Sequence, residues 1–416
     1  MNLGILVGGG PAPGINGVIA AAAREAIKCG LRVVGIYDGY RDLAAGTPVL
    51  TREIDDDDIA RIRYSGGSLL RTSRTNPAKD AASLERCIAG IRALDLRYLV
   101  CIGGDDTTYG ATKIAEAAGS TLGIATVPKT IDNDLPLPDN APTFGFETAR
   151  SVGTEIVESL IEDAMTTSRW YLVVSMGRKS GALALGMCKA AGATLAVIPE
   201  EFPPNADVGL AIDTIVGSIV KQRALGRLDG VAIVAEGVAE RLSLESLSSL
   251  DGVERDAFGH VRLADIPIGP VLRDGVRKRL TELGVDTTVT AKDVGYELRC
   301  AKPVPFDLDY TRTLGYGAVR YLLDGGSGAL IALRGGRVEP MRLEELIDPQ
   351  TGRIRTRLVD VTTEAYRVAR DNMVRLEAED LDSPQVERIA AQTTLDPQTF
   401  RLQFEAAVRV SPTTPV

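Results

Sequence analysis

Histidine and aromatic residues are scarce in this sequence. It has one histidine, His260, and one tryptophan, and aromatic residues make up 5% of the chain. A single histidine argues against a histidine-rich zinc site or a histidine-based catalytic triad. The low aromatic content, together with 43 glycines, favours an alternating α/β protein with many tight turns over a β-sandwich.

Cysteine is also sparse, and its spacing matches no metal or redox motif. The cysteines are odd in number, scattered and without a CxxC pair: Cys29, Cys87, Cys101, Cys188 and Cys300. This pattern argues against a disulfide framework or a zinc site and predicts free, buried thiols in a reducing compartment. We therefore expect a cytoplasmic protein.

Long hydrophobic runs are missing as well. A transmembrane helix needs about 18 or more consecutive apolar residues, and no window of the sequence approaches that length. The start, MNLGILVGGG, lacks the basic residues of a signal peptide and predicts a first strand. The net charge of −9 argues against nucleic acid or an anionic membrane as the main partner, although local Arg and Lys clusters decide whether an anionic substrate binds.

What the chain does contain is an alternation of short apolar strands with helical segments, which predicts parallel sheets with helices on both faces. Its 416 residues fit two or three domains. We expect two doubly wound, Rossmann-like α/β units at 1–145 and 146–340, with a crossover from the second back to the first. A helical C-terminal extension is expected at 341–416.

Unusual turns follow the expected strands at their carboxyl ends, where open α/β sheets bind ligands. GGGPAPGING (8–17) follows the first strand and opens a helix, so its backbone N–H groups could attract phosphate. It lacks both the GxGxxG spacing of dinucleotide sites and the GK[ST] end of a Walker A loop. A tight turn that binds no ligand is an equal alternative.

Two carboxylates stand in GGDD (103–106), directly after another expected strand. Asp105 or Asp106 could hold Mg²⁺, which takes one or two protein carboxylates and fills its remaining positions with substrate phosphates and water. The alternative is a single Asp that caps the following helix. Two adjacent Asp residues after a Gly pair favour the metal interpretation.

The segment PKTIDNDLP (128–136) also ends a strand. Thr130, Asp132 and Asp134 alternate with apolar or amide residues, so in an extended segment they would share one side. Asp132 could act as general base for a hydroxyl within hydrogen-bond reach. A polar loop closed by prolines is the alternative.

Arginines occur in two further segments, and their forked guanidinium groups suit phosphate. Arg71 and Arg74 lie in GGSLLRTSRTNP, and Arg169 and Arg178 stand at opposite ends of one strand. Surface salt bridges are the alternative for these side chains. Because Arg169 and Arg178 point in different directions, we expect one active site to use only one of them from a given chain.

The remaining polar segments divide into candidates and ordinary surface. Glu236 ends a strand and could bind a sugar hydroxyl, and VGYELR contributes Tyr296 and Arg299. We expect the acidic run 55–58 to be a solvated helix start and the pair at 200–201 to lie on a solvent-facing loop.

Taken in order along the chain, these turns resemble those of the phosphofructokinase family: GGGPAPGING, GGSLLRTSR, GGDD, PKTIDND, SRWYLVVSMGR, AEG and GYELR. TIDND and MGR in this order are specific, whereas GGD alone also occurs in NAD and lipid kinases. The resemblance implies the phosphofructokinase fold and phosphoryl transfer to the 1-hydroxyl of fructose 6-phosphate, with Mg²⁺ as cofactor. It implies a homodimer or homotetramer too, because Arg169 matches an arginine that bacterial members donate across a subunit interface.

The same resemblance implies a role for each candidate residue. Asp132 matches the base, Asp105 the Mg²⁺ ligand, and Arg74 an arginine that stabilises charge on the transferring group. The donor-phosphate loop is matched by Gly9 and Gly10. The sugar-phosphate contacts are matched by Thr130, Arg169, Met176, Gly177, Arg178, Glu236, Tyr296 and Arg299.

Two positions bear on the phosphoryl donor. Where this sequence has Asp106 and Lys129, ATP-using members typically have glycine, and pyrophosphate-using members resemble this sequence. A carboxylate at 106 would place negative charge where the α-phosphate of ATP lies, whereas Lys129 offers a cation to a compact donor. We therefore predict a reversible, pyrophosphate-dependent enzyme of glycolysis and gluconeogenesis. The alternatives are an ATP-dependent phosphofructokinase and a sugar-phosphate-binding regulator without catalysis.

The sequence departs from the family pattern at the sugar-phosphate pocket. Tyr296 stands where ATP-dependent bacterial members have histidine, and Thr290 stands where an arginine is expected, with Lys292 the nearest cation. A longer acceptor such as sedoheptulose 7-phosphate is therefore a second expectation for the pocket.

Overall fold

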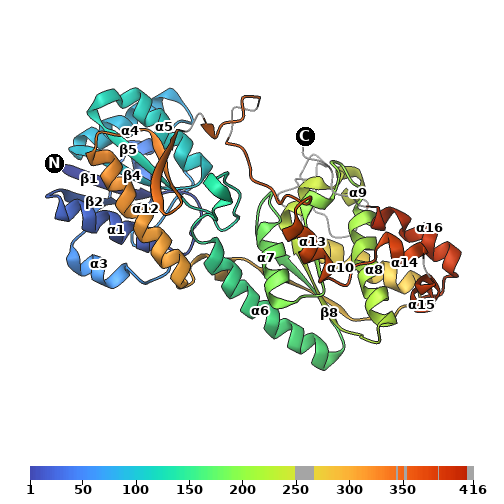
Figure 1. Ribbon diagram of the computed structural model, residues 1–416. Coiled ribbons are helices and arrows are strands. Elements are labelled where there is room, and N and C mark those ends of the chain that lie inside the picture. The colour runs from blue at the N-terminus through green and yellow to red at the C-terminus, as the bar shows by residue number, and fades with distance from the viewer. Residues whose placement is uncertain (249–266, 343–344, 351–353, 383, 410–416) are drawn as a thin grey trace. The chain divides into compact units, whose positions relative to one another are not determined.

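The computed structural model describes residues 1–248, 267–342, 345–350, 354–382 and 384–409. His260 lies outside the described residues. The chain divides into two compact units, which contain the two sheets seen in Figure 1. Unit 1 comprises Met1–Ala149 and Tyr296–Arg357, and unit 2 comprises Arg150–Gly295 and Leu358–Val416.

Unit 1 is built on a seven-stranded sheet with the order β11-β10-β5-β4-β1-β2-β3. Its strands are β1 (Asn2–Val7), β2 (Arg32–Ile36), β3 (Thr51–Glu53), β4 (Leu96–Gly103), β5 (Gly123–Pro128), β10 (Ala329–Arg334) and β11 (Arg337–Arg342). The five inner strands are parallel, and the edge strands β3 and β11 pair antiparallel to their neighbours. The carboxyl ends of β1, β4 and β5 therefore lie side by side.

Alternate side chains of β1 enter two core layers, because a strand directs successive residues to opposite faces. Leu3, Ile5 and Val7 are buried with α1 (Ile15–Lys28) and α12 (Pro305–Leu323), and Leu6 is buried on the other face with α4 (Ala81–Ala93) and α5 (Asp105–Ala118). The sheet is thus covered by helices on both faces, as expected for parallel strands. The shorter helices of unit 1 are α2 (Arg41–Ala45), α3 (Asp56–Ile62) and α11 (Tyr296–Arg299).

Unit 2 is built on a four-stranded parallel sheet with the order β7-β8-β6-β9. Its strands are β6 (Trp170–Ser175), β7 (Leu195–Val197), β8 (Gly230–Ala235) and β9 (Val289–Val294). The helices that precede the C-terminal region are α6 (Phe146–Thr167), α7 (Ala182–Ala191), α8 (Val208–Ala224), α9 (Leu244–Ser248) and α10 (Ile268–Glu282). Every residue of β6 and β8 is buried, which agrees with their apolar sequences, in which Ser175 at the end of β6 is the exception.

The C-terminal region of unit 2 is helical, as expected. It contains α13 (Glu364–Asp371), α14 (Ala378–Asp382), α15 (Gln385–Ala390) and α16 (Pro397–Val408). Phe400 and Phe404 of α16 are fully buried and stack with 4.5 Å between ring centroids, in the same core cluster as α8. Gly217 of α8 lies against this cluster, because a Cβ there would stand 3.1 Å from Leu376.

The observed units differ from the expected boundaries in two main respects. The expected extension 341–416 is divided between the units, because unit 1 ends at Arg357 and unit 2 resumes at Leu358. Residues 296–340, which the sequence analysis placed in the second domain with a crossover back to the first, belong to unit 1. The reason is that β10 pairs with β5 and that α12 packs closely on α1. Gly315 of α12 permits this approach, since a Cβ there would lie 2.6 Å from the Val18 carbonyl oxygen. The antiparallel hairpin of β10 and β11 was not anticipated.

Two acidic segments differ from their expected solvated state. Asp55 caps α3 by accepting from the Asp58 N–H, but Asp58 itself is buried and accepts from Arg52 and Arg61. The pair at 200–201 is buried too: Glu201 pairs with the buried Arg375 at 2.7 Å. Residues 55–57 are exposed at a helix start, as expected, so the expectation was wrong at Asp58 and at the pair 200–201. Asp58 is buried with partners three and six positions away in the sequence, whereas the partner of Glu201 is 174 positions away.

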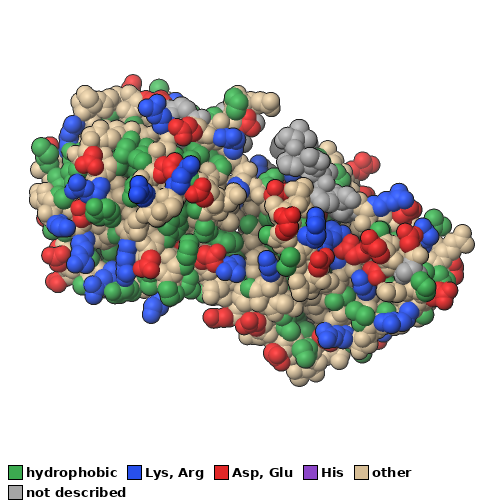
Figure 2. Space-filling view, viewed as in Figure 1, with side chains coloured by type: hydrophobic (Ala, Val, Ile, Leu, Met, Phe, Trp, Pro, Cys, Tyr) green, Lys and Arg blue, Asp and Glu red, His purple; other side chains and the backbone are tan. Residues whose placement is uncertain are grey.

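The cysteines are free, but only three of them are buried: Cys87, Cys101 and Cys188 are, whereas Cys29 and Cys300 are exposed. Among the described residues, no helix is both long and apolar enough to cross a bilayer. Acidic and basic side chains are interspersed over the face drawn in Figure 2, in keeping with the modest net charge of −9.

Candidate active site

The glycine-rich turn after β1 is fixed by the segment 72–74. The Gly9 N–H donates to the Ser73 carbonyl at 2.8 Å, and the Thr72 hydroxyl donates to the Gly9 carbonyl at 2.6 Å. Gly9 has a φ of +83°, a left-handed value that favours glycine. The structure thus brings the predicted donor loop and the predicted arginine segment together in unit 1.

The side chain of Lys129 contacts this turn. The residue follows β5, is buried, and its ammonium group donates to the Gly10 carbonyl. Its backbone N–H donates to the Gly103 carbonyl at 3.0 Å, so the end of β4 fixes the lysine backbone. A Cβ on Gly9 would stand 3.0 Å from the Lys129 Nζ, which is a second reason for glycine at this position.

Two guanidinium groups approach the same turn. The position that a Cβ would occupy on Gly10 is 3.7 Å from the Arg299 Cζ and 3.9 Å from an Arg74 terminal nitrogen. Arg299 also stacks over the Tyr296 ring, with 4.9 Å to its centroid. Lys129, Arg74 and Arg299 therefore surround one glycine turn with positive charge, an arrangement that suits a phosphate group.

Asp105 and Asp106 are the first two residues of α5 and form its first turn. The helix is capped by Gly104 without a side-chain bond, so neither Asp acts as the N-cap residue that the alternative interpretation required. Asp106 is exposed, Asp105 is partly buried, and both lie where the helix dipole stabilises negative charge. A Cβ on Gly103 would overlap Thr107 at 2.4 Å, so this glycine allows the sharp entry into the helix. Among the described residues there is no group of three or more potential metal-binding side chains.

The loop that contains Asp132 is compact and not extended. Asn133 has a φ of +57°, so the expected extended segment with three polar groups on one side was wrong. The Asp132 N–H donates to the Thr130 hydroxyl at 3.0 Å, and the Thr143 hydroxyl donates to the Thr130 carbonyl at 2.9 Å. Asp134 is buried, whereas Asp132 is partly exposed and keeps access to solvent.

In unit 2, a tight loop follows β6 and contains Met176, Gly177 and Arg178. Glu236, at the end of β8, accepts from the Gly177 N–H at 3.1 Å and from the Arg178 N–H at 2.8 Å through one carboxylate oxygen. Gly237 lies so close that a Cβ there would stand 2.1 Å from the Arg178 carbonyl. The carboxylate of Glu236 therefore orients the loop, and a role toward a sugar hydroxyl stays a prediction.

Arg169 and Arg178 flank β6, and only Arg178 belongs to this loop. The Arg169 Nε is 4.0 Å from the Asp163 carboxylate, which also accepts from the Tyr171 hydroxyl and raises the pKa of that tyrosine. Lys292, the cation nearest to the missing arginine, is exposed on β9. Tyr296 and Arg299, in contrast, belong to unit 1.

Comparison with known proteins identifies the fold of these two units. The sequence matches the phosphofructokinase family over residues 2–322. The chain belongs to the phosphofructokinase family. It is 48% identical over 408 residues to a pyrophosphate–fructose 6-phosphate 1-phosphotransferase from Thermotoga maritima, with 97% of each chain covered. It is 44% identical to the protein of the same name from Naegleria fowleri, with 98% of this chain and 96% of the relative covered.

Solved structures agree on the phosphofructokinase fold. The structure of a pyrophosphate-dependent phosphofructokinase from Marinobacter aquaeolei superposes with a TM-score of 0.67 at 20% identity. The match covers 89% of this chain and 90% of that one. At this level of identity the match concerns the fold alone.

Sequence reasoning on this phosphofructokinase chain missed two residues that shape the site. Thr72 lies within the arginine segment and holds the Gly9 carbonyl, and its position between Arg71 and Arg74 was the available signal. Arg357 donates to the carbonyls of Asn133 and Ala141, in the loop that contains Asp132. No local pattern marks Arg357, because its partners are more than 200 positions away in the sequence.

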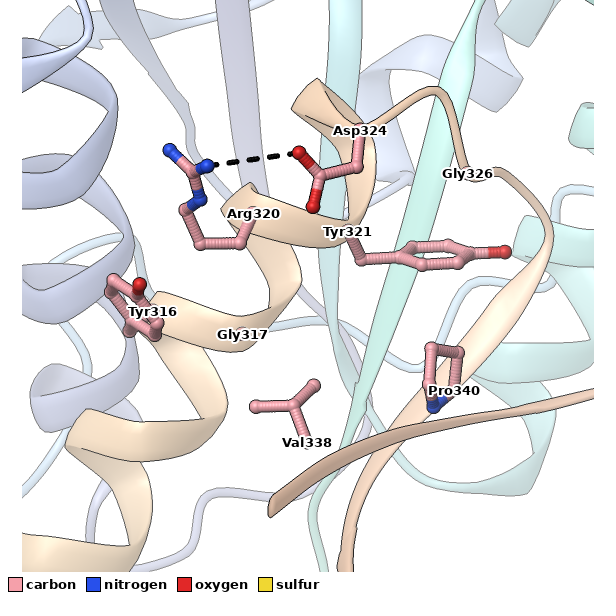
Figure 3. Close-up of a pocket in the computed structure, with 8 residues that line it drawn as sticks. All are labelled: Tyr316, Gly317, Arg320, Tyr321, Asp324, Gly326, Val338 and Pro340. Carbon is pink, nitrogen blue, oxygen red and sulfur yellow. Dashed lines mark ion pairs between the residues drawn. The ribbon is translucent and has the colours of Figure 1, made fainter.

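A cavity of about 420 Å³ lies elsewhere in unit 1, on α12 and β11. Figure 3 shows its lining, in which Arg320 faces Asp324 at 3.7 Å and Tyr316 and Tyr321 lie on opposite sides. None of the predicted site residues lines this cavity, and we assign no ligand to it.

Proposed function

We propose that this protein transfers a phosphoryl group between pyrophosphate and the 1-hydroxyl of fructose 6-phosphate, forming fructose 1,6-bisphosphate and phosphate. The observation that carries the proposal is the buried Lys129 ammonium beneath the glycine turn, with Arg74 and Arg299 beside it. The names of the two relatives with more than 40% identity support the same reaction. The reaction runs in both directions because the phosphoanhydride donor and the phosphate ester differ little in free energy.

The donor is selected by charge and space in this proposal. Lys129 supplies a cation to the compact diphosphate at Gly9 and Gly10. Asp106, exposed in the first turn of α5, repels the α-phosphate of a nucleotide. Both effects favour pyrophosphate over ATP, since an unpaired like charge at close range is costly.

Mg²⁺ is the cofactor implied by the family, and the donor set fits it. Asp105 and Asp106 offer carboxylate oxygens at the start of α5, and Mg²⁺ commonly uses one or two such ligands together with phosphate oxygens. Asp105 would hold the ion. When bound, Mg²⁺ neutralises charge on the phosphate oxygens.

In the proposed reaction, different residues of the chain transfer the proton, stabilise charge and bind the sugar phosphate. Asp132 accepts the proton of the 1-hydroxyl as its oxygen attacks the terminal phosphorus, and the bond to the leaving phosphate breaks. Arg74 and Lys129 stabilise the charge that spreads over the transferring group. Contacts to the sugar phosphate are assigned to Thr130, Arg169, Met176, Gly177, Arg178, Glu236, Tyr296 and Arg299. In unit 2, Glu236 keeps the loop of Arg178 in place.

Assembly and location complete the proposal. A homodimer or homotetramer would let Arg169 act in the neighbouring subunit, and free thiols suit the cytoplasm. Because Thr290 replaces an expected arginine, sedoheptulose 7-phosphate is tested as a second acceptor.

The reaction is tested by following the products in both directions. Pyrophosphate, Mg²⁺ and fructose 6-phosphate are mixed with the enzyme, and phosphorus NMR reports the appearance of fructose 1,6-bisphosphate and phosphate. The reverse mixture should yield pyrophosphate and fructose 6-phosphate. If neither mixture reacts while ATP supports product formation, the proposed donor is wrong; if no donor reacts, the protein is not the proposed enzyme.

A further inference from the structure

We propose that Arg357, in the C-terminal part of unit 1, is a positioning residue that holds the loop of Asp132 in its working conformation. The inference rests on the proposed function, in which Asp132 is the base, and it gives the segment after β11 a role in catalysis. Arg357 itself is not placed in contact with either substrate.

Four donor groups of Arg357 are used on this one loop. Its backbone N–H donates to the Asp134 carbonyl at 2.7 Å, and its Nε donates to the Asn133 carbonyl at 2.9 Å. One terminal nitrogen donates to the Ala141 carbonyl at 2.8 Å, and the other donates to the Asn133 side-chain oxygen. One side chain therefore joins the two ends of the segment 133–141.

These contacts matter because the loop has little regular structure of its own. Asn133, the neighbour of Asp132, has a left-handed φ of +57°, a conformation that residues other than glycine rarely adopt and that asparagine tolerates through local hydrogen bonds of its side chain. The side-chain oxygen of Asn133 also accepts from the Thr143 N–H at 3.1 Å. The guanidinium and Thr143 thus hold Asn133 jointly, and the backbone next to the base depends on both.

The electrostatic surroundings of Arg357 favour a guanidinium group that stays bound to the loop. Burial lowers the pKa of Arg357, and the Asp134 carboxylate opposes that shift. A half-buried guanidinium is stabilised here by carbonyl and amide oxygens in fixed directions, which a flexible ammonium cannot reproduce. Arginine and lysine should therefore not be interchangeable at position 357.

Apolar packing holds the chain around Leu346, which precedes Arg357, against the loop that contains Asp132, and it does so independently of Arg357. Leu346 is buried in a small cluster with Leu135 and Leu137, which follow Asp134 in the chain. The Arg355 N–H donates to the Leu346 carbonyl at 2.8 Å. The segment should therefore remain docked when the guanidinium is removed, so that the effect of the side chain can be measured.

The experiment compares Arg357→Ala and Arg357→Lys with Arg355→Ala as the matched control. Arg355 is exposed, and within the part of the chain that the structure describes its side chain donates only to the Glu345 carbonyl. We expect Arg357→Ala to lower kcat about 100-fold, because a displacement of about 1 Å at a reacting group can cost that much. The KM values for pyrophosphate and fructose 6-phosphate should change less than about threefold. The kcat of Arg357→Lys should lie between those of Arg357→Ala and the wild type. Added guanidinium ion should restore part of the activity of Arg357→Ala and leave the activity of Arg355→Ala unchanged.

Two further measurements separate positioning from general stability. Combining Arg357→Ala with Asp132→Ser should slow the reaction no more than Asp132→Ser alone, since a displaced base and an absent base are equivalent. Amide exchange in residues 130–144 should increase in Arg357→Ala and stay unchanged in β4. Unchanged exchange in that loop, or a kcat within about twofold of wild type, would overturn the inference.

Failure of the proposed function would be recognised separately. If the wild type uses only ATP, the same variants are assayed with ATP, and the predicted kcat and exchange results still decide whether Arg357 positions the loop. If Arg357→Ala keeps full turnover with pyrophosphate, the proposed reaction stands and the positioning role is removed.

Discussion

Replacing Lys129 with methionine removes one positive charge from the glycine turn while keeping a side chain of similar length. The lysine is buried and its ammonium donates to the Gly10 carbonyl, so the substitution removes a charge that lies against the turn. In the proposed reaction this ammonium contacts the diphosphate. The variant therefore isolates the contribution of one charge to donor binding and transfer.

The size of the effect follows from Coulomb's law. At a separation of about 4 Å and an effective dielectric constant of about 20, an ammonium and one phosphate charge attract by about 4 kcal/mol. Each 1.36 kcal/mol corresponds to about tenfold in rate, so kcat/KM for pyrophosphate should fall by about 10³. This value is an upper estimate, because Arg74 and Arg299 remain beside Gly10 and compensate in part.

The assay couples fructose 1,6-bisphosphate formation to NADH oxidation at varied pyrophosphate. Lys113→Met is the matched control, since Lys113 is also a lysine of unit 1 but pairs with Glu116 on the surface of α5. It should keep wild-type kinetics. A Lys129→Met enzyme that folds with an unchanged Tm and retains kcat/KM within about threefold would refute the placement of the donor at this turn. The double variant Asp106→Gly with Lys129→Gly should also gain activity with ATP.

Three other experiments test separate parts of the account. Asp132→Ser should lower kcat by about 10²–10⁴ with a small change in KM, and unchanged turnover would remove Asp132 from the role of base. Arg375→Met leaves the buried Glu201 carboxylate without its ion pair, so it should destabilise unit 2 by about 3–5 kcal/mol in chemical denaturation. The control Arg409→Met removes an exposed ion pair and should change the free energy of unfolding by less than about 1 kcal/mol. Maleimide at pH 8 should label two of the five thiols of the folded protein. Burial raises the pKa of the other three thiols to about 12 and keeps them protonated: Cys87, Cys101 and Cys188. Rapid labelling of a third thiol would contradict their burial.

The sequence predicts best those sheet strands that are buried on both faces. β1, β4, β6 and β8 are mainly apolar and buried over most of their length, and such segments have few alternatives to a central parallel strand. The turns at the carboxyl ends of β1, β4 and β5 could be grouped for the same reason, since parallel neighbours end at one edge of a sheet. The structure places Lys129 beside the glycine turn, whereas its role toward the donor was implied by the resemblance to the family.

Most details that sequence reasoning missed depend on partners far away in the chain, although the burial of Asp58 and the hairpin of β10 and β11 involve residues close by. Glu201 is buried because Arg375 and the Tyr366 hydroxyl reach it, and nothing near position 201 indicates that. The turn at Asn133 is left-handed because Thr143 and Arg357 hold its side chain. An alternating polar pattern alone predicts an extended segment there, which is why the local interpretation of 130–134 was wrong.

The central claim is that the site accepts a bare diphosphate in preference to a nucleotide. The most direct measurement is the ratio of kcat/KM for pyrophosphate to kcat/KM for ATP in the wild-type enzyme, at saturating fructose 6-phosphate and Mg²⁺. The account predicts a ratio well above one, up to the value of about 10³ worked out above for one close charge contact. A ratio of one or less would contradict it.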